Sequence, residues 1–249
     1  MALRGVLFDL GRTILHYAPA GKTWEDMERI GALGVYRQLL DQQYALLPET
    51  NALDIAWDCA HTMWSTLDSQ DVKNLRLSYQ IGLVVRQWGI ENLPADMTDA
   101  LALVYMSAIQ AYVTPLEGAE ETLRGLRDLG LRIGLISNTI WPGNSHKADL
   151  DRYNLTPYFD HLIFSADAEL WKPHKEVFQL GLNALGLKPE EAIFVGDALY
   201  FDVWGAQQVG MRGVWIEQSH VWLPDGLEVT PDAVIKSLPD LLDIVEGWR

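Results

Sequence analysis

Cysteine is almost absent from this sequence. Cys59 stands alone among 249 residues, so no disulfide can form within the chain. Disulfide-built secreted folds are therefore excluded, and nothing indicates an oxidising compartment. Long apolar runs are absent too: the first, at residues 6–8, is broken by Asp9, and none approaches the ~20 residues of a membrane helix. We expect a cytoplasmic protein with no targeting segment and no membrane partner.

Basic residues are scarce. The chain has 19 Lys and Arg against 34 Asp and Glu, which gives a formal net charge of −15. Such a chain lacks the basic surface that binding to nucleic acid or to anionic membranes requires, so neither partner is expected. A hydrophobic content of 49% is enough for a real core and excludes a disordered chain. The length fits one large domain, or a core domain with a smaller insert.

Residues 16–114 differ in pattern from the rest of the chain. They contain long stretches without strand signals, and apolar residues such as Leu77 and Ile81 recur there at helical spacing. Thr23 begins a segment that resembles a helix N-terminus, with its hydroxyl as the cap. This block is therefore predicted to be a separate, all-helical domain.

After Pro115 the pattern changes to short apolar strands that alternate with helices. This alternation is typical of βαβ units and of a parallel sheet with both faces covered. We predict an α/β fold in which residues 1–15 and 115–249 form a Rossmann-like parallel sheet with helices on both faces. The expected strands are residues 5–8, 133–136, 162–164, 192–195, 213–216 and 233–235, and one expected helix covers residues 201–209.

Polar side chains stand at the ends of these strands or in the loops that follow. In open parallel sheets, ligands bind beyond the carboxyl ends of the strands, so these groups are expected to converge. Mg²⁺ prefers oxygen ligands and leaves room for a phosphate, whose remaining charge a lysine would balance. A carboxylate that faces such a phosphoryl group can act as a nucleophile. The candidate residues are Asp9, Ser137, Asn138, Lys172, Asp197 and Asp202.

Four motifs carry these residues: Phe8–Thr13 (FDLGRT), Leu135–Thr139 (LISNT), Trp171–Pro173 (WKP) and Val195–Asp202 (VGDALYFD). In this order, each at a strand end or in the loop after it, they resemble the haloacid dehalogenase-like hydrolase superfamily. The resemblance covers residues 1–15 and about 115–245 as the core. The helical block takes the place of the cap domain that the family inserts after its first motif.

The resemblance implies a role for each matching residue. Asp9 would attack phosphorus and form an aspartyl-phosphate. Asp9, Asp197 and the backbone carbonyl of Gly11 would bind Mg²⁺. Ser137 would hydrogen-bond the phosphoryl group, with Asn138 beside it as a further substrate-binding or loop-supporting residue.

The resemblance also assigns two catalytic roles around the nucleophile. Lys172 would neutralise the charge that Asp9 shares with the phosphate, and so would contribute to both substrate binding and catalysis. Asp202 would position Lys172 or a metal-bound water. The implied activity is a Mg²⁺-dependent phosphatase that acts on a small phosphorylated metabolite.

Gly11 departs from the usual phosphatase pattern, in which a second aspartate two residues after the nucleophile is the general acid and base. A glycine still offers its carbonyl to a metal, but it cannot transfer a proton, and such catalysis is worth roughly 10²–10⁴-fold. His16 or residues of the helical domain are candidate replacements. The alternative functions are a 2-haloacid dehalogenase, and a weakly catalytic phosphate-binding or regulatory protein.

Other conspicuous residues have simpler explanations. Cys59 and His61 are two residues apart on an expected helix and would not face each other. Trp57, Trp64 and Trp88 are expected in the core of the helical domain rather than in a ligand cage. The sequence names neither the substrate nor the oligomeric state.

Overall fold

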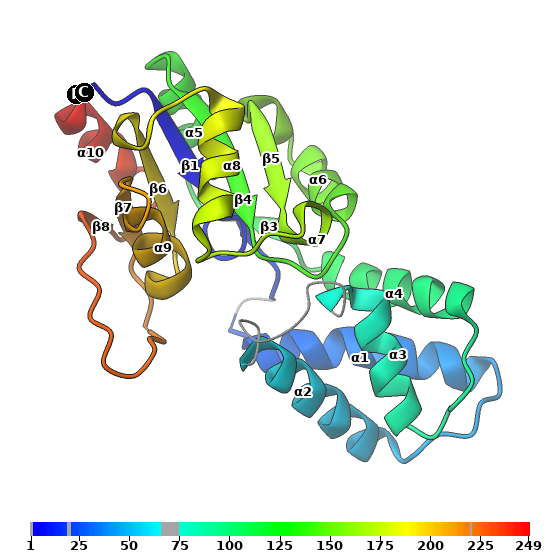
Figure 1. Cartoon of the computed structure of the whole chain (residues 1–249). Helices are drawn as coiled ribbons and strands as arrows, with labels where there is room; N and C mark the ends of the chain where they lie inside the picture. The colour runs from blue at the N-terminus through cyan, green and yellow to red at the C-terminus, as the bar shows by residue number, and fades with distance from the viewer. Residues whose placement is uncertain (1, 19–20, 66–74, 220) are drawn as a thin grey trace. The chain divides into compact units, whose positions relative to one another are not determined.

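The computed structural model describes residues 2–18, 21–65, 75–219 and 221–249. The chain divides into two compact units. An α/β unit comprises residues up to His16, Thr114–Thr139 and His146–Arg249, and a helical unit comprises Tyr17–Val113 and Ile140–Ser145. Each unit is drawn in Figure 1 and is described by itself below.

The α/β unit is built on a six-stranded sheet in the order β5-β4-β1-β6-β7-β8, in which every neighbouring pair is parallel. The predicted α/β fold with a Rossmann-like sheet is thereby confirmed. β1 is central because its four residues are fully buried and apolar or glycine, as a strand covered on both faces requires. The strands are β1 (Gly5–Phe8), β4 (Arg132–Ser137), β5 (His161–Phe164), β6 (Ala192–Gly196), β7 (Arg212–Ile216) and β8 (Ala233–Ile235).

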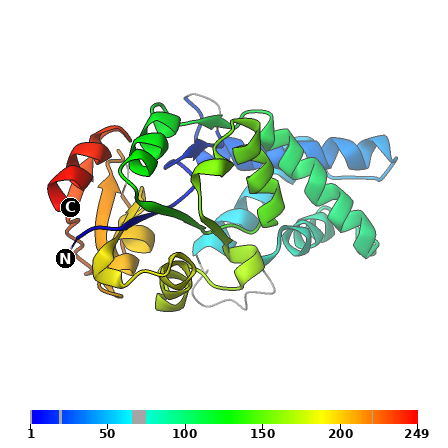
Figure 2. The same ribbon diagram turned by 90° about the horizontal axis from the view of Figure 1, so that it is seen from above.

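Helices cover both faces of this sheet (Figures 1 and 2). On one face, α8 (Lys175–Leu185) and α9 (Gly205–Gln207) share an apolar cluster with strand residues, in which Leu7 and Ile136 contact Phe178 and its neighbours. On the other face lie α5 (Ala119–Asp128) and α10 (Asp240–Trp248). Gly125 of α5 lets Leu242 of α10 approach closely, because an added Cβ would lie 2.9 Å from the leucine side chain.

The elements after β4 and β6 differ from the sequence prediction. The predicted helix over residues 201–209 is a π-helical stretch, Leu199–Trp204, followed by the single turn of α9. Two short helices that we did not predict, α6 (Gly143–Arg152) and α7 (Ser165–Ala168), flank β5. The remaining short helical turns are Thr156–Tyr158 and Pro189–Glu191.

Two short strands that the sequence did not predict stand where the α/β unit leads into and out of the helical unit. β2 (Leu15–His16) and β3 (Thr114–Pro115) pair antiparallel, with Leu15 opposite Pro115 and His16 opposite Thr114. Leu116 N also donates a hydrogen bond to Ile14 O at 2.9 Å. The two crossing segments are thus tied to each other within the α/β unit.

The helical unit contains α1 (Trp24–Asp41), α2 (Glu49–Ser65), α3 (Leu77–Gln87) and α4 (Ala95–Gln110). Thr23 caps α1 as expected, with a reciprocal capping box to Asp26. The buried Trp88 donates its indole N–H to Ala52 O at 2.9 Å and lies in the unit's core. None of the helices in the described part of the chain is both long and apolar enough to cross a bilayer.

Residues 140–145, directly after the second motif, belong to the helical unit rather than to the sheet that precedes them. Ile140 O accepts a hydrogen bond from Leu77 N at 3.0 Å, at the start of α3. The Trp141 ring meets those of Tyr17 and Tyr105 edge to face, with centroids 5.8 and 6.2 Å apart. The helical unit therefore includes a segment that begins more than 25 residues after its main block ends.

Candidate active site

The position of Asp9, the predicted nucleophile, is set by the middle of the sheet. Asp9 follows β1 directly, and its backbone N–H donates to Val195 O on β6 at 2.9 Å, so the strand pairing extends one residue beyond Phe8. β4 and β6 flank β1, so Ser137 and Asp197 also stand at this carboxyl edge. Asp9 is 8% exposed and Ser137 5% exposed. Parallel pairing thus brings the ends of three separate motifs to one place.

Lys172 lies between two carboxylates. Its Nζ is 2.6 Å from Asp9 Oδ1 and 2.7 Å from Asp202 Oδ1, and its side chain is 2% exposed. Burial alone would lower the pKa of Lys172, but the charges of Asp202 and Asp9 outweigh it and hold the pKa above the ordinary value. The lysine is therefore a fixed cation in contact with the nucleophile position.

Asn138 holds Lys172 in place through the backbone. Asn138 Nδ2 donates to Lys172 O at 2.9 Å, and Lys172 N donates to Asn138 Oδ1 at 2.8 Å. The next residue, Thr139, is held in a similar way by Ser165, whose Oγ accepts from Thr139 N at 2.7 Å and donates to Thr139 O at 2.9 Å. Both polar ends of the Asn138 amide are thus engaged with the lysine loop. Its supporting role has a geometric basis, and substrate contact by Asn138 stays a prediction.

Asp202 fits into the site because residue 196 is glycine. A Cβ added to Gly196 would lie 2.2 Å from Asp202 Oδ2. That oxygen accepts from Ala198 N at 2.9 Å, while Oδ1 meets Lys172. The π-helical stretch Leu199–Trp204 thus places the Asp202 carboxylate against Gly196, the last residue of β6.

Three carboxylates cluster at this edge. Asp9, Asp197 and Asp202 each offer one oxygen, and these atoms lie within 4.8 Å of one another. Burial, and after it the charge of Asp9, raises the pKa of Asp197 to about 7. Burial also raises the pKa of Asp202, to about 6, against the opposing pull of Lys172. Acids crowded in this way are held ionised more easily when a cation is present.

The donor set suits a hard cation. The Asp202 side chain is 2% exposed, whereas those of Asp9 and Asp197 are 12% and 13% exposed, so Asp9 and Asp197 are the members of the cluster that an ion at the sheet edge can reach. Carboxylate oxygens are the ligands that Mg²⁺ takes in phosphoryl-transfer sites. The residues present therefore fit the predicted ion.

Comparison with known proteins decides the family. The family model of haloacid dehalogenase-like hydrolases matches residues 3–210. The chain belongs to this family. The match includes all four motifs described above, and the prediction of a hydrolase of this superfamily is confirmed.

Relatives of this hydrolase include phosphatases. The chain is 33% identical over 171 residues to the glyceraldehyde 3-phosphate phosphatase of Pyrococcus furiosus, an alignment that covers 68% of this chain and 69% of that protein. Among solved structures, a magnesium-bound HAD-hydrolase from Bacillus subtilis aligns over 98% of this chain and 99% of its own, at a TM-score of 0.67 and 20% identity. A 2-haloacid dehalogenase from Pseudomonas syringae aligns over 99% and 100%, at a TM-score of 0.69 and 24% identity. The two structures show the shared fold.

Two residues of the hydrolase's first motif contact the site and were assigned no role from the sequence. Thr13 Oγ1 donates to Asp9 Oδ2 at 3.2 Å and is fully buried. Arg12 Nε lies 3.2 Å from Asp197 Oδ2. The signal was present, because both stand in the Phe8–Thr13 motif, but side-chain direction in a loop has no period from which it can be read.

The remaining residues singled out in the sequence are Gly11, His16 and Cys59. Apart from its chain neighbours, no atom of the described residues lies within 4 Å of a Cβ added to Gly11, so open space stands beside the position where an acid–base aspartate is usual. His16 lies on β2, and its side chain is exposed. Desolvation by the surrounding protein, and after it the charge of Arg12, lowers the pKa of this histidine. Cys59 is half-buried in α2, where Gln87 Nε2 donates to its Sγ at 3.4 Å and burial raises the pKa of the thiol.

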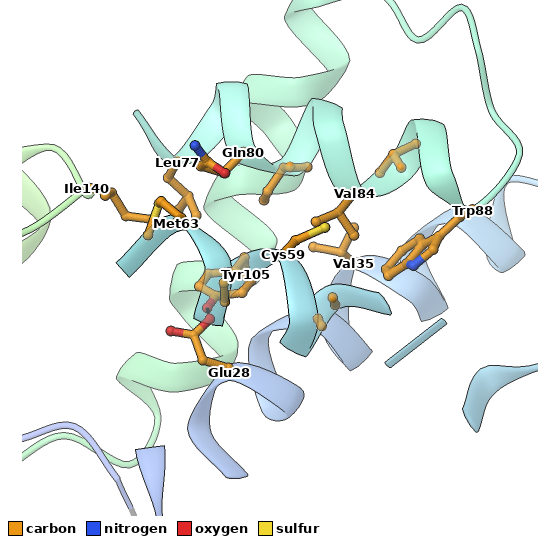
Figure 3. A pocket seen from close by; sticks show the side chains of 15 residues that line it. Glu28, Val35, Cys59, Met63, Leu77, Gln80, Val84, Trp88, Tyr105 and Ile140 are labelled. Carbon is orange, nitrogen blue, oxygen red and sulfur yellow. Dashed lines mark hydrogen bonds between the residues drawn. The ribbon is translucent and has the colours of Figure 1, made fainter. Parts of the chain in front are cut away.

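A separate pocket of about 50 Å³ lies inside the helical unit of the hydrolase (Figure 3). Cys59 and Trp88 line it among mostly apolar neighbours. At one end, Tyr105 donates its hydroxyl to the Glu28 carboxylate, and burial raises the pKa of Glu28. Of the three tryptophans expected in the helical core, Trp88 lies there, beside this cavity. The expectation was wrong for Trp57 and Trp64, which are half-buried and meet the exposed Trp24 ring edge to face.

Proposed function

We propose that this chain is a Mg²⁺-dependent phosphatase that hydrolyses a small phosphorylated metabolite through an aspartyl-phosphate on Asp9. The single observation that carries the proposal is the contact at 2.6 Å between Lys172 Nζ and Asp9 Oδ1, made beside a cluster of carboxylates. A carboxylate that a fixed cation holds in one orientation is a competent nucleophile. The phosphatase from Pyrococcus furiosus supports the same reaction type.

The Asp9 and Asp197 carboxylates, with the Gly11 backbone carbonyl, would hold the Mg²⁺. When bound, the ion would supply charge neutralisation at the phosphoryl oxygens. Asp202 would stay outside this set, because its side chain is 2% exposed and is held by Lys172 and by Ala198 N.

In the proposed reaction, an Asp9 carboxylate oxygen forms a bond to phosphorus while the bond from phosphorus to the leaving oxygen breaks. Lys172 balances the charge that Asp9 and the phosphoryl group share, and Asp202 keeps the ammonium in place. Ser137 donates a hydrogen bond to the phosphoryl group. Water then attacks the aspartyl-phosphate, which releases phosphate and restores the Asp9 carboxylate.

The decisive experiment compares the wild type with Asp9→Asn on p-nitrophenyl phosphate, with Mg²⁺ or with a chelator. Only the wild type with Mg²⁺ should release p-nitrophenol and phosphate, and the variant should lose roughly 10³-fold or more in turnover. Asp225→Asn, at an exposed aspartate of the same unit, is the matched control and should behave as the wild type. Equal rates in the Asp9 variant and the wild type would exclude the proposed nucleophile.

A dehalogenase is the second candidate, because the Pseudomonas syringae enzyme shares the fold and the reaction would use the same carboxylate. That chemistry needs no metal, whereas Asp197 adds a carboxylate beside Asp9 that suits a metal. Chloride release from a 2-chloroacid in the presence of a chelator would favour the dehalogenase. The third candidate, a phosphate-binding protein of low activity, predicts phosphate binding without turnover, and Gly11 is the residue that favours it.

A further inference from the structure

Arg12 adopts a backbone conformation that is unusual for a residue with a side chain. It stands three residues after Asp9 with φ of 59°, in the left-handed region that glycine takes at no cost. For an arginine this conformation is unfavourable, because its Cβ crowds the following carbonyl oxygen. Such residues cluster at active sites and ligand clamps, where the surrounding contacts hold them in place. The Arg12 side chain is therefore expected to have a role that compensates for this backbone conformation.

The Arg12 guanidinium is fixed at two points and still open to solvent. Its Nε lies 3.2 Å from Asp197 Oδ2, and Nη2 donates to Gln218 Oε1 at 2.6 Å. The side chain is 57% exposed, in contrast to the buried Lys172. A guanidinium has five N–H donors, so capacity remains beyond these two contacts. Arg12 can thus meet a further anion without leaving its place in the loop.

The binding of a metal would change the electrostatics around this arginine. At present Arg12 balances the charge of Asp197, while Lys172 is engaged by Asp9 and Asp202. A divalent cation on Asp197 would take over that balance and repel the guanidinium. A guanidinium beside a neutralised partner binds another planar anion well, and the structure already shows it paired with a carboxylate.

We propose that Arg12 is a specificity-determining residue, which selects phosphate monoesters that carry a carboxylate close to the phosphoryl group. Arg12 moves from Asp197 to the substrate carboxylate when Mg²⁺ binds Asp197, and Gln218 holds the guanidinium during the exchange. The inference rests on the proposed phosphatase activity for its biological meaning. Its physical content, a preference in binding, does not depend on turnover.

The test uses two ligands that differ only in the group that Arg12 would read. 3-Phosphoglycerate carries a carboxylate where glycerol 3-phosphate carries a hydroxymethyl group. Binding of each is measured by calorimetry with saturating Mg²⁺ in the Asp9→Asn background, which prevents turnover. We expect 3-phosphoglycerate to bind about tenfold more tightly, as one charge-assisted contact allows. Adding Arg12→Gln should abolish this preference, and adding Arg12→Lys should retain part of it.

Two further variants separate recognition from general effects of charge and folding. Arg124→Gln removes an equally exposed arginine of the same unit, paired with Glu120 on α5, and should leave the preference intact. Arg12→Gly accepts the positive φ without strain and should lose the preference as Arg12→Gln does. A second measurement needs no substrate: Mg²⁺ alone should bind Arg12→Gln more tightly than the wild type, because the competing guanidinium is gone.

The outcomes distinguish this inference from the proposed function. Equal binding of the two ligands in the Asp9→Asn background, or a preference that survives Arg12→Gln, overturns the role of Arg12. If Arg12→Gln abolishes the preference but the wild type releases no phosphate from any ester, the role of Arg12 stands and the proposed phosphatase activity is overturned. Mg²⁺ affinity that is unchanged in Arg12→Gln contradicts the exchange at Asp197.

Discussion

Lys172 Nζ lies 2.7 Å from Asp202 Oδ1, and both side chains are 2% exposed. The pair is remote in sequence from Asp9, yet it determines the charge that Asp9 meets, because the same ammonium is 2.6 Å from Asp9 Oδ1. A buried cation shared by two carboxylates is stable only while all three partners are present. Removal of the lysine therefore has consequences for folding as well as for catalysis.

Lys172→Met should destabilise the metal-free protein by about 3–5 kcal/mol, because it leaves Asp9 and Asp202 buried without their cation. Urea unfolding at pH 7 in a chelator measures the change. Lys172→Met combined with Asp202→Asn removes one of the two uncompensated charges and should recover part of the loss. Stability equal to that of the wild type in the single variant would contradict the ionised three-residue cluster.

Asp197→Asn should weaken Mg²⁺ binding by at least about tenfold while the protein remains folded, because an amide is a poorer ligand than a carboxylate. Calorimetric titration with Mg²⁺ measures the affinity, and circular dichroism checks the fold. Asp225→Asn removes an exposed carboxylate of the same unit and is the matched control. Unchanged Mg²⁺ affinity in the Asp197 variant would remove this residue from the metal site.

The raised pKa values of Asp197, about 7, and of Asp202, about 6, predict a dependence of stability on pH. Between about pH 4 and pH 7 these two carboxyl groups bind more protons in the metal-free native state than in the unfolded chain, so together they make stability fall as the pH rises through this window. The buried His146, whose pKa is lowered to about 3, acts in the opposite direction as a single group. Thermal unfolding at pH 5 and pH 8 in a chelator should show this loss. Asp197→Asn mimics the neutral acid and should reduce the slope.

Added Mg²⁺ should act in the opposite direction. The ion binds the ionised carboxylates, so its stabilising effect should be larger at pH 8 than at pH 5. Thermal unfolding with and without Mg²⁺ at both pH values tests this. A stabilisation that is independent of pH would mean that Asp197 is already ionised at pH 5.

Local patterns in the sequence were enough to predict the strands and the residues at their ends. A buried parallel strand is a short apolar run, and its end is marked by the first polar residue, as with Asp9 after β1. The fold then brings Asp9, Lys172 and Asp202 together without further information. The catalytic and metal-binding roles of these residues remain predictions.

What the sequence did not reveal depends on contacts between distant segments. The pairing of β2 with β3 joins residues that are about 100 positions apart, and neither two-residue strand has a period of its own. Residues 140–145 join the helical unit through contacts of Ile140 and Trp141. From the local sequence, these two residues only continue the loop after the Leu135–Thr139 motif. The π-helical turn over 199–204 differs from an α-helix only in its hydrogen-bond partners, which composition does not encode.

Gly11 stands where the related phosphatase pattern has an acid–base aspartate. Apart from the chain neighbours of Gly11, no atom of the described residues lies within 4 Å of a Cβ added there, so the Cβ of Gly11→Asp meets no obstacle. In the proposed reaction, the absence of such a group would let the leaving oxygen depart unprotonated and water attack the aspartyl-phosphate without a base. Aryl phosphates release a weakly basic oxygen and need little protonation, whereas alkyl phosphates need much more.

Gly11→Asp should therefore raise turnover more on glycerol 3-phosphate than on p-nitrophenyl phosphate, within the roughly 10²–10⁴-fold range of acid–base assistance. Steady-state phosphate release on both substrates measures the two rate increases. Gly11→Asn is the control, because it supplies the same bulk without a titratable group. The wild type should show an initial burst of p-nitrophenol, because breakdown of the aspartyl-phosphate is the step that lacks a base. If the wild type already hydrolyses the alkyl phosphate quickly and Gly11→Asp slows it, another acid is at work. His16→Ala then becomes the informative variant, because His16 is the candidate replacement that the sequence offers near Asp9.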